Sequence, residues 1–334
     1  MQRFGDMSPS KASLEIMEIL LYLGLFIGSL AVLLKASDWF VDGAEQIGLS
    51  FGLSPFIVGV TIVAFGTSLP ELATSIAAVL SGDSEIVAGN VVGSNITNIA
   101  LVLGISALVA KRIEMDYNIW HIDMPYLWGS AFIMWFVLRD LHFSFFESLL
   151  FLLGIVIFLA YSFQNVQDDK AARKANNIEE EDRPKLSVMA FVMVLGGGVL
   201  VWLSADYTIL AIQKLSTIAG IKPEIIALSA VAVGTSLPEI IVSVNAARKG
   251  KAAIAVGNVL GSNIFNTYVV MSVPSFFGKL SISNEMIDFY IPLMIVMTVL
   301  FGVVSNNKKI TRWEGVLLLL FYVYFFGELL SNAS

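Results

Sequence analysis

The chain has 334 residues, of which 57% are hydrophobic and 14% are charged, and its formal net charge is −7. A soluble domain carries about 25% charged residues, so this composition, in long uninterrupted apolar runs, excludes an ordinary soluble protein and predicts an all-α polytopic membrane protein. The chain contains no cysteine, which excludes a disulfide framework and a thiolate metal site.

Ten apolar segments are long enough to cross a bilayer, which takes about 20 helical residues. They cover approximately residues 17–37, 53–80, 86–110, 120–138, 145–164, 187–207, 222–247, 252–278, 286–305 and 312–330. The order predicts a first five-helix repeat (1–164), a cytoplasmic linker (165–186) and a second five-helix repeat (187–334). We expect the linker to be a solvated tether, because charge-rich segments without apolar residues stay disordered. A regulatory cation site is the alternative.

The second and third spans carry sequences that return in the seventh and eighth. Residues 64–71 read AFGTSLPE and residues 232–239 read AVGTSLPE. Further along, GNVVGSNITN at 89–98 returns as GNVLGSNIFN at 257–266. The offset between the copies is the same for both blocks, with no insertion or deletion between them, so the chain contains an internal repeat.

Because each half holds five spans, an odd number, the second half must enter the membrane in the opposite sense to the first. Lysine and arginine favour cytoplasmic loops, and this arrangement puts fourteen of the twenty on one side. The fourteen are Lys35, Lys111, Arg112, Lys170, Arg173, Lys174, Arg183, Lys185, Arg248, Lys249, Lys251, Lys308, Lys309 and Arg312. The turn 81–85 and both termini then lie outside, while the basic turn 248–251 lies inside. This pattern is typical of inverted-topology repeats, whose substrate site lies near the bilayer midplane.

The first copy of the motif predicts an interrupted helix that bears oxygen ligands. Thr67, Ser68 and Glu71 project onto one helical face, because position 71 is three and four residues beyond the other two. Pro70 lacks an N–H, and its ring clashes with the carbonyl of Gly66. We therefore expect a kink or break that frees main-chain carbonyls at 64–66 to line a polar cavity.

The following span predicts a second oxygen-bearing face, since Ser94 and Asn98 are four residues apart. Gly89 and Gly93 form a G-x-x-x-G pair, and Gly257 and Gly261 repeat it. Such pairs allow two membrane helices to approach closely, and we expect the close neighbour to be the kinked helix of the same repeat.

Pooling both copies gives a candidate cation site made only of oxygen donors. Its members are Glu71, Glu239, Thr67, Thr235, Ser68, Ser236, Ser94, Ser262, Asn98, Asn266 and the freed carbonyls. All-oxygen coordination suits hard cations such as Ca²⁺ and Na⁺, and two carboxylates match the charge of one Ca²⁺. Hydroxyls in membrane helices also serve as interhelical contacts without further function, but a carboxylate at mid-membrane depth indicates function by default.

The two motifs, GTSLPE followed by GSNI-x-N and present twice, resemble the α-repeats of the sodium/calcium exchanger family, of the prokaryotic type with two α-repeats. The resemblance covers all ten spans and implies alternating access, in which sodium entry drives calcium extrusion. It implies that Glu71 and Glu239 ligate calcium. It also implies contributions to calcium and sodium sites from Thr67, Ser68, Ser94, Thr235, Ser236, Ser262 and the carbonyls of Ala64 and Ala232.

One position separates branches of this family, because potassium-dependent members have Asp where this chain has Asn266. Amides at Asn98 and Asn266 therefore argue against potassium transport and remove one candidate for proton coupling. A proton-coupled antiporter remains an alternative, as do a passive channel and a membrane-embedded hydrolase. The repeat argues against the hydrolase, because acid/base pairs need two different environments, whereas symmetry predicts similar ones for Glu71 and Glu239.

The remaining expectations concern location and the outlying acids. We expect a prokaryotic inner-membrane protein that needs no cofactor, no nucleic acid and no protein partner. Asp38 and Asp206 occupy equivalent positions of the two repeats. They are expected at span ends in headgroup water, the alternative being that they line the approach to the site. Asp42 and Glu45 are expected to be solvated in the first extramembrane turn.

Overall fold

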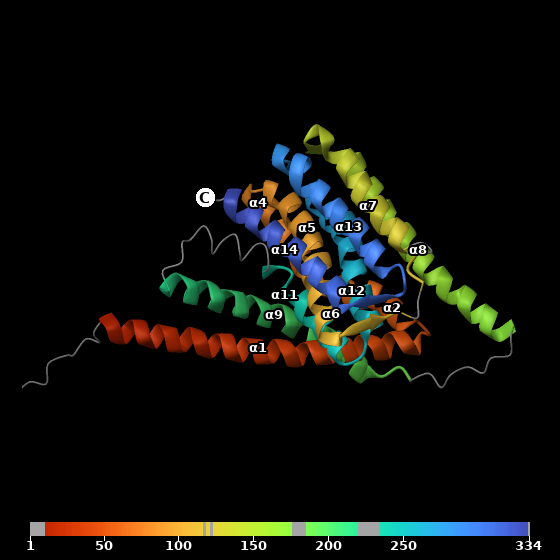
Figure 1. Ribbon diagram of the computed structural model, residues 1–334, viewed down its shortest axis with the longest axis horizontal. Helices are drawn as coiled ribbons and strands as arrows, with labels where there is room; N and C mark the ends of the chain where they lie inside the picture. The colour runs from red at the N-terminus through yellow and green to blue at the C-terminus, as the bar shows by residue number, and fades with distance from the viewer. Residues whose placement is uncertain (1–10, 116–117, 121–122, 176–184, 220–233, 333–334) are drawn as a thin grey trace, which may run out of the picture.

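The computed structural model describes the chain except for residues 1–10, 116–117, 121–122, 176–184, 220–233 and 333–334 (Figure 1). The described part is nearly all helical, and eight helical stretches are long and apolar enough to cross a membrane. These are Ile16–Ser50, Pro55–Ser81, Glu85–Ala110, Phe145–Gln164, Val188–Ile218, Ala252–Phe276, Met286–Ser305 and Arg312–Ser331. The predicted fourth span corresponds to the shorter helix α7 (Asp123–Val137). The predicted seventh is helical from α11 (Leu237–Arg248), and its first half lies outside the described residues.

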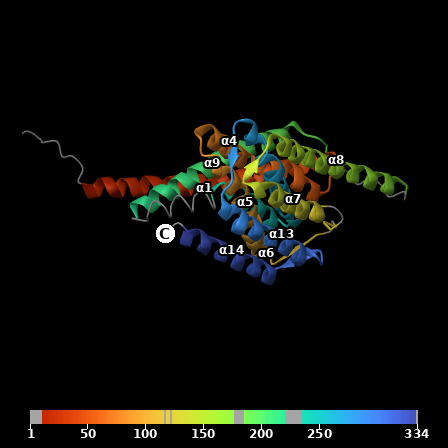
Figure 2. The same ribbon diagram turned by 90° about the horizontal axis from the view of Figure 1, so that it is seen from above.

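Two long helices, α1 (Lys11–Ser50) and α9 (Val188–Ile218), lie side by side across the rest of the bundle (Figures 1 and 2). Both continue beyond their predicted spans, 17–37 and 187–207, so the predicted ends were wrong. Asp38 and Asp206 interrupt the apolar runs near those points, but nothing breaks the helix, because a polar side chain on one helical face does not disturb the backbone. Leu20 and Leu195 are among many large apolar side chains that α1 and α9 expose, as lipid-facing helices do.

The repeated segments form the buried interior. In the first repeat the order is α2 (Pro55–Val58), η1 (Gly59–Val63), α3 (Ala64–Thr67), α4 (Leu69–Ser81), α5 (Glu85–Thr97), η2 (Asn98–Val102) and α6 (Leu103–Ala110). In the second repeat the described order is α11, α12 (Ala252–Phe265), η4 (Asn266–Val270) and η5 (Val273–Phe276). The π-helical segments η2 and η4 begin at Asn98 and Asn266, which are equivalent positions of the two motifs. The backbone thus repeats where the sequence does.

Two short antiparallel ribbons mark opposite ends of the bundle. Strand β1 (Arg112–Glu114) pairs with β4 (Lys309–Thr311), and β2 (His142–Phe143) pairs with β3 (Leu280–Ser281). Helix α7, followed by the short η3 (Leu138–Asp140), leads from β1 to β2. The helix formed by η6 (Met286–Tyr290) and α13 (Ile291–Ser305) leads from β3 to β4. A 20-residue helix is about 30 Å long, so the ribbons are separated by about the thickness of a bilayer core.

The last helices of the two halves are α8 (Phe145–Ala175) and α14 (Arg312–Asn332). Helix α8 continues eleven residues past 164, so the first half of the predicted tether is helical rather than irregular. Residues 176–184 of that linker lie outside the description. Helix α14 packs against α6, where Gly104 and Gly315 allow close approach, because a Cβ on either would come within 3 Å of the other helix.

Candidate ion-binding site

Both motif helices are interrupted at the serine of the GTSLPE motif. Ser68 separates α3 from α4 with φ −90° and ψ 6°, and Ser236 precedes α11 with φ −84° and ψ 6°. Pro70 and Pro238 then stand in the first turn of the following helix, where a missing N–H leaves no hydrogen bond unmade. The predicted break is therefore present in both copies.

The carbonyls that the break was expected to free are only partly free. The carbonyl of Ala64 accepts a hydrogen bond from the Ser68 N–H at 3.1 Å and lies 3.4 Å from the Thr67 hydroxyl oxygen. Ala64 is four residues before Ser68, so this bond survives, and proline removes only the bond that its own N–H would have made. The equivalent Ala232 lies outside the described residues.

Glu71 and Glu239 occupy the first turn after each break and are both fully buried. Their carboxyl groups are close enough to interact electrostatically with each other. No described hydroxyl or amide donates a hydrogen bond to either oxygen of Glu71, whereas the Oε1 atom of Glu239 accepts one from Ser68 at 3.0 Å. The expected equality of the two environments is therefore incomplete.

The candidate hydroxyls make contacts between the two repeats. Ser68 reaches Glu239 across the repeat boundary, and Ser94 lies 3.3 Å from Thr235, measured between the hydroxyl oxygens. The hydroxyl oxygens of Thr67 and Ser262 are 3.5 Å apart. The buried hydroxyl of Ser236 has no hydrogen-bond partner among the described residues. Five of the six hydroxyl-bearing candidates, Thr67, Ser68, Ser94, Thr235 and Ser262, therefore lie within 3.5 Å of a candidate side chain of the other repeat.

The candidate amides lie at the α-to-π transitions of the third and eighth spans. Asn98 and Asn266 are fully buried. The amide nitrogen of Asn98 donates to Asn263 Oδ1 at 3.1 Å, and the side chain of Asn266 makes no hydrogen bond to any described residue. Single π-turns inside α-helices are frequent at functional sites, and here they widen the helix where the amides stand.

Several polar residues of the site are absent from the predicted set. Asn90 donates to the Glu71 carbonyl at 3.0 Å and to the Ser75 hydroxyl at 2.9 Å, and Asn258 donates to the Ser243 hydroxyl at 2.8 Å. A signal was available, because Asn258 and Ser243 are the counterparts of Asn90 and Ser75 in the second repeat. Spacing within one helix did not reveal it, since each bond joins two helices.

A reciprocal pair of amides joins the two repeats at their centre. Asn95 donates to the Asn263 carbonyl at 3.4 Å, and Asn263 donates to the Asn95 carbonyl at 3.2 Å. These two residues occupy equivalent positions of the two repeats. The side-chain amide of each donates to the main-chain carbonyl of the other. Such reciprocity is what two halves related by a two-fold axis produce.

The second glycine pair, Gly257 and Gly261, packs against the opposite repeat, so the neighbour predicted for it was wrong. A Cβ on Gly257 would lie 2.4 Å from the Phe56 carbonyl oxygen, and one on Gly261 would lie 2.3 Å from the Val60 carbonyl oxygen. Helix α12 therefore rests directly on α2 and η1 of the first repeat. Sequence proximity suggested a partner in the same repeat, but the interlocking of the two halves decides the contact. The segment equivalent to α2 and η1 in the second repeat falls within residues 220–233, which are outside the described part of the chain, so the neighbour of Gly89 and Gly93 is not described.

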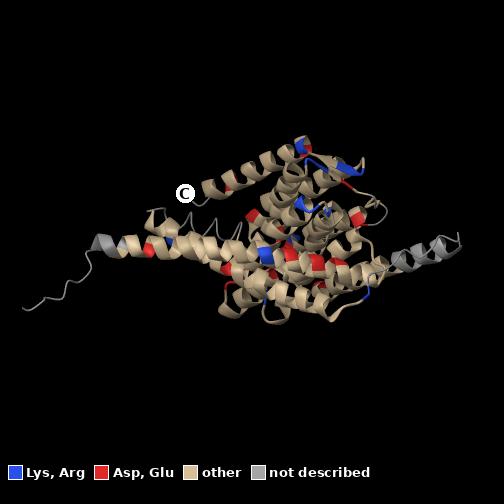
Figure 3. Ribbon diagram, turned by 90° about the horizontal axis from the view of Figure 1, so that it is seen from below, with Lys and Arg blue, Asp and Glu red and all other residues tan. Residues whose placement is uncertain are grey.

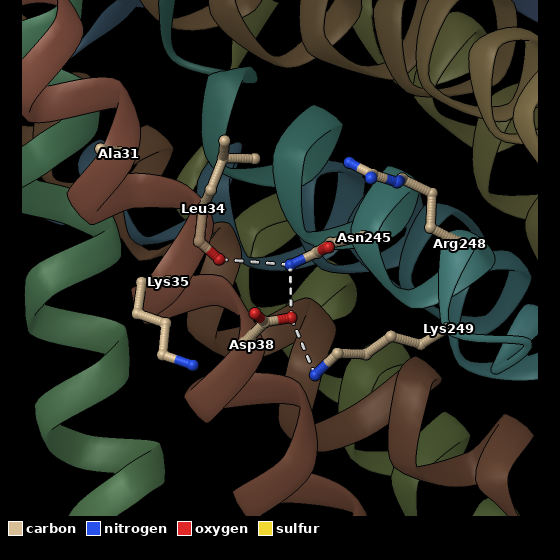
Figure 4. A pocket seen from close by; sticks show the side chains of 7 residues that line it. All are labelled: Ala31, Leu34, Lys35, Asp38, Asn245, Arg248 and Lys249. Carbon is tan, nitrogen blue, oxygen red and sulfur yellow. Dashed lines mark hydrogen bonds and ion pairs between the residues drawn. The ribbon is translucent and has the colours of Figure 1, made fainter.

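The acids of α1 form a second polar region, at the turn between α11 and α12. Figure 3 shows acidic and basic residues gathered along α1, and Figure 4 shows Asp38 between Asn245 and Lys249. Asp38 lies 2.8 Å from Lys249, Asp42 lies 2.6 Å from Lys251, and Glu45 lies 2.6 Å from Lys251. We call Asp38, Asp42, Glu45, Lys249 and Lys251 the ionic cluster.

The ionic cluster corrects two predictions about the outlying acids. Asp42 and Glu45 stand on α1 rather than in a turn, and they are paired rather than merely solvated. Asp38 contacts the basic turn, whereas Asp206 is exposed within α9, twelve residues before that helix ends. Burial alone would lower the pKa of Lys251, but its hydrogen bonds to Asp42 and Glu45 and their charges outweigh burial and raise that pKa. The ammonium therefore stays charged near neutral pH.

The buried site offers oxygen donors of three kinds: carboxylate, hydroxyl and amide. No group of three or more His, Cys, Asp or Glu side chains is placed to hold a metal ion in the part of the chain that is described. A dehydrated hard cation needs several oxygens and enough negative charge to balance its own. Two carboxylates among neutral oxygens meet both needs for a divalent ion, or for one or two monovalent ions.

Three comparisons relate the chain to known proteins. The family model described as sodium/calcium exchanger protein matches residues 21–164 and 189–327. The chain is 33% identical to sodium/calcium exchanger MaX1 of Methanosarcina acetivorans, over 91% of this chain and 97% of the relative. It is 30% identical to inner membrane protein YrbG of Escherichia coli strain K12, over 90% of this chain and 94% of the relative. A solved structure of the sodium-calcium exchanger NCX_Mj, soaked with zero Na⁺ and Ca²⁺, superposes with a TM-score of 0.79 at 31% identity, covering 93% of this chain and 99% of that one.

Proposed function

We propose a transport function for this chain, which belongs to the sodium/calcium exchanger family. It is a secondary antiporter that exchanges Na⁺ for Ca²⁺ across a membrane by alternating access. MaX1 and NCX_Mj, both similar over nearly their whole length, carry the name of that activity. The same two ions suit the oxygen donors of the buried site.

The observation that carries this proposal is the pair of buried carboxyl groups at the repeat boundary. Glu71 and Glu239 have no basic partner among the described residues around them, and burying a charge without a counter-charge is costly. A bound cation supplies the missing charge. We propose Glu71 and Glu239 as calcium ligands, assisted by Thr67, Ser68, Ser94, Asn98, Thr235, Ser236, Ser262 and Asn266, with the carbonyls of Ala64 and Ala232.

Exchange requires that the site be emptied on either side of the membrane but not on both at once. Ser68 hydrogen-bonds to Glu239, and Gly261 packs on Val60. The site is therefore built from side chains of both repeats. A displacement of one repeat relative to the other therefore changes ion coordination and helix packing together. This coupling favours an exchanger over a passive channel, since a channel needs no such dependence.

We further propose ten spans arranged as two inverted five-helix repeats, 1–164 and 187–334, with 165–186 as a cytoplasmic linker. The positions of the two motif turns support inversion. Ser84, in the turn 81–85, accepts from the Ser281 N–H at the ribbon formed by β2 and β3. The turn 248–251 is separated from that ribbon by the whole length of α12, η4 and η5.

The same two ends differ in charge as the positive-inside rule requires. Lys111, Arg112, Lys308, Lys309 and Arg312 gather around the ribbon formed by β1 and β4, whereas Arg139 and Lys279 lie beside the opposite ribbon. We therefore assign the β1–β4 end to the cytoplasm and both termini to the outside of a prokaryotic inner membrane. We also propose that transport needs no cofactor and no protein partner, and that the chain is not an enzyme.

Sodium-driven calcium uptake tests this function. Purified protein is reconstituted into liposomes that contain Na⁺, and ⁴⁵Ca²⁺ uptake is measured on dilution into Na⁺-free buffer. We expect uptake that requires internal Na⁺ and persists when an ionophore collapses the pH gradient. Uptake that follows a pH gradient and ignores Na⁺ would instead identify a proton-coupled antiporter.

A further inference from the structure

Each motif threonine is hydrogen-bonded to an asparagine of the opposite repeat. The Thr67 hydroxyl lies 3.1 Å from Asn258 Oδ1, and the Thr235 hydroxyl lies 3.2 Å from Asn90 Oδ1. Both asparagines are buried, with exposures of 0% for Asn258 and 3% for Asn90. The two bonds join equivalent positions of the internal repeat, so the same threonine–asparagine contact occurs once for each repeat.

The direction of these bonds follows from what holds the other end of each amide. The Nδ2 atom of Asn90 lies 3.0 Å from the Glu71 carbonyl, which can only accept, so nitrogen rather than oxygen must face it. The Oδ1 atom of Asn90 then faces Thr235, and the threonine must donate. At Asn258 the Nδ2 atom lies 2.8 Å from the Ser243 hydroxyl, the same contact that Asn90 makes with Ser75, so repeat equivalence gives this amide the same orientation.

A threonine that donates its single proton to an amide keeps its lone pairs for other partners. Thr235 is also 3.3 Å from Ser94, which must then be the donor in that contact. A cation accepts electron density from oxygen lone pairs and is repelled by a hydroxyl hydrogen. A threonine whose proton is turned towards asparagine is therefore a better cation ligand than one that rotates freely.

We propose that Asn90 and Asn258 are positioning residues that orient the Thr235 and Thr67 hydroxyls for cation binding, each asparagine serving the opposite repeat. The inference rests on the proposed exchange function, because it assumes that cations bind among these oxygens. It adds a cross-repeat dependence: α5 orients a ligand on the second motif helix, and α12 orients a ligand on the first. Movement that separates the repeats removes ligand orientation together with the ligand.

Double-mutant cycles on the reconstituted full chain test this pairing. Asn258→Ala and Thr67→Val are made singly and together, and Asn258→Ala with Thr235→Val is the matched control pair. The readout is the Ca²⁺ concentration for half-maximal sodium-driven uptake, with the maximal rate measured separately. Removing a residue that orients a metal ligand costs about 10- to 100-fold in affinity, so we expect a rise of that size for Asn258→Ala with a smaller change in maximal rate.

The cross-repeat pair should show most of the coupling. We expect Thr67→Val to add clearly less in the Asn258→Ala background than it does alone, because the orientation of that ligand is already lost, whereas Thr235→Val should add nearly its full single effect. Asn258→Asp, which keeps an acceptor oxygen, should be less impaired than Asn258→Ala. The symmetric cycle of Asn90→Ala with Thr235→Val provides the same test if one alanine variant does not fold.

Each failure has a separate meaning. Suppose that the unaltered protein shows normal sodium-driven uptake. Equal coupling in both pairs would then overturn the positioning role alone. An unchanged Ca²⁺ concentration for half-maximal uptake in Asn258→Ala and Asn90→Ala would do the same. Absence of sodium-driven uptake by the unaltered, folded protein overturns the exchange function and the positioning role with it.

Discussion

The buried site and the ionic cluster both contain carboxylates, but they treat charge in opposite ways. Asp38, Asp42 and Glu45 each lie within 3.0 Å of a lysine ammonium and remain partly exposed. Glu71 and Glu239 are fully buried, interact with each other and have no lysine or arginine partner among the described residues. In the ionic cluster, lysine side chains compensate the carboxylate charge. In the buried site, we propose that a bound cation does so.

This difference separates structural charge from functional charge. A partly exposed ion pair contributes about 0–1 kcal/mol, so the ionic cluster can join α1 to the α11–α12 turn without dominating stability. An uncompensated buried carboxyl group costs free energy, and a chain retains two of them only where something is gained. The following variants are arranged from the largest expected effect to the smallest.

Removing the charge of the buried site should abolish transport. We expect Glu71→Gln or Glu239→Gln to lower sodium-driven Ca²⁺ uptake by about 100-fold or more, because calcium affinity follows the charge of its ligands. Thermal unfolding without added cations should be unchanged or shifted upwards, since glutamine buries no charge. Glu85→Gln, at an exposed position after α4, is the matched control and should transport normally. Unaltered uptake in either buried variant would mean that these carboxylates are not ligands.

Crowding a close contact between the two repeats should lower the stability of the protein. A methyl group on Gly261 would lie 2.3 Å from the Val60 carbonyl oxygen and 2.7 Å from the Ala64 Cβ. We expect Gly261→Ala to destabilise the protein by about 1–3 kcal/mol, as overpacking does, measured as a lower thermal unfolding midpoint. Gly28→Ala on α1, which meets nothing within 4 Å, is the control and should not destabilise the protein.

Adding a charge to the buried site should strengthen Ca²⁺ binding rather than remove activity. Asn266 is buried without a hydrogen-bond partner among the described residues. We expect Asn266→Asp to lower the Ca²⁺ concentration for half-maximal uptake by about two- to tenfold at about pH 8, because a third carboxylate adds ligand charge. Lowering the pH protonates that carboxylate and should reverse the gain. Asn306→Asp, at an exposed position, is the control and should show neither effect. If the half-maximal Ca²⁺ concentration of Asn266→Asp did not depend on pH, residue 266 would lie away from the bound ions.

Breaking the ionic cluster should have the smallest effect. We expect Lys249→Gln or Lys251→Gln to lower the free energy of unfolding by less than about 1 kcal/mol, with the loss shrinking at high salt. Uptake should stay close to that of the unaltered protein. Lys214→Gln, exposed on α9, controls for the loss of a charge. A loss of transport as large as that of Glu71→Gln would show that the cluster belongs to the transport machinery.

Much of the site was predictable because its chemistry is local. The break at Pro70 follows from a missing N–H, and the shared face of Thr67 and Glu71 follows from helical spacing, so both could be inferred within one turn. The cross-repeat partners could not. Asn258 lies 191 residues from Thr67, and Gly261 packs on Val60 rather than on its own repeat, because the interlocking of the halves has no local signature.

The ends of α1 and α9 show the same limit. Hydropathy locates where apolar side chains stop, whereas a helix continues until its backbone is broken. Whether Asp42 stands in water or against a lysine depends on which turn packs beside α1.

Composition, spacing and proline chemistry act within short stretches of chain, so the amino-acid order was enough to establish the membrane class, the duplicated motif and the oxygen donors. The packed structure was needed to show which candidate oxygens lie close together, which helix packs against Gly257 and Gly261, and which carboxylates pair with a lysine. These depend on how two distant halves interlock, and close packing between them is set by the shapes of both surfaces together.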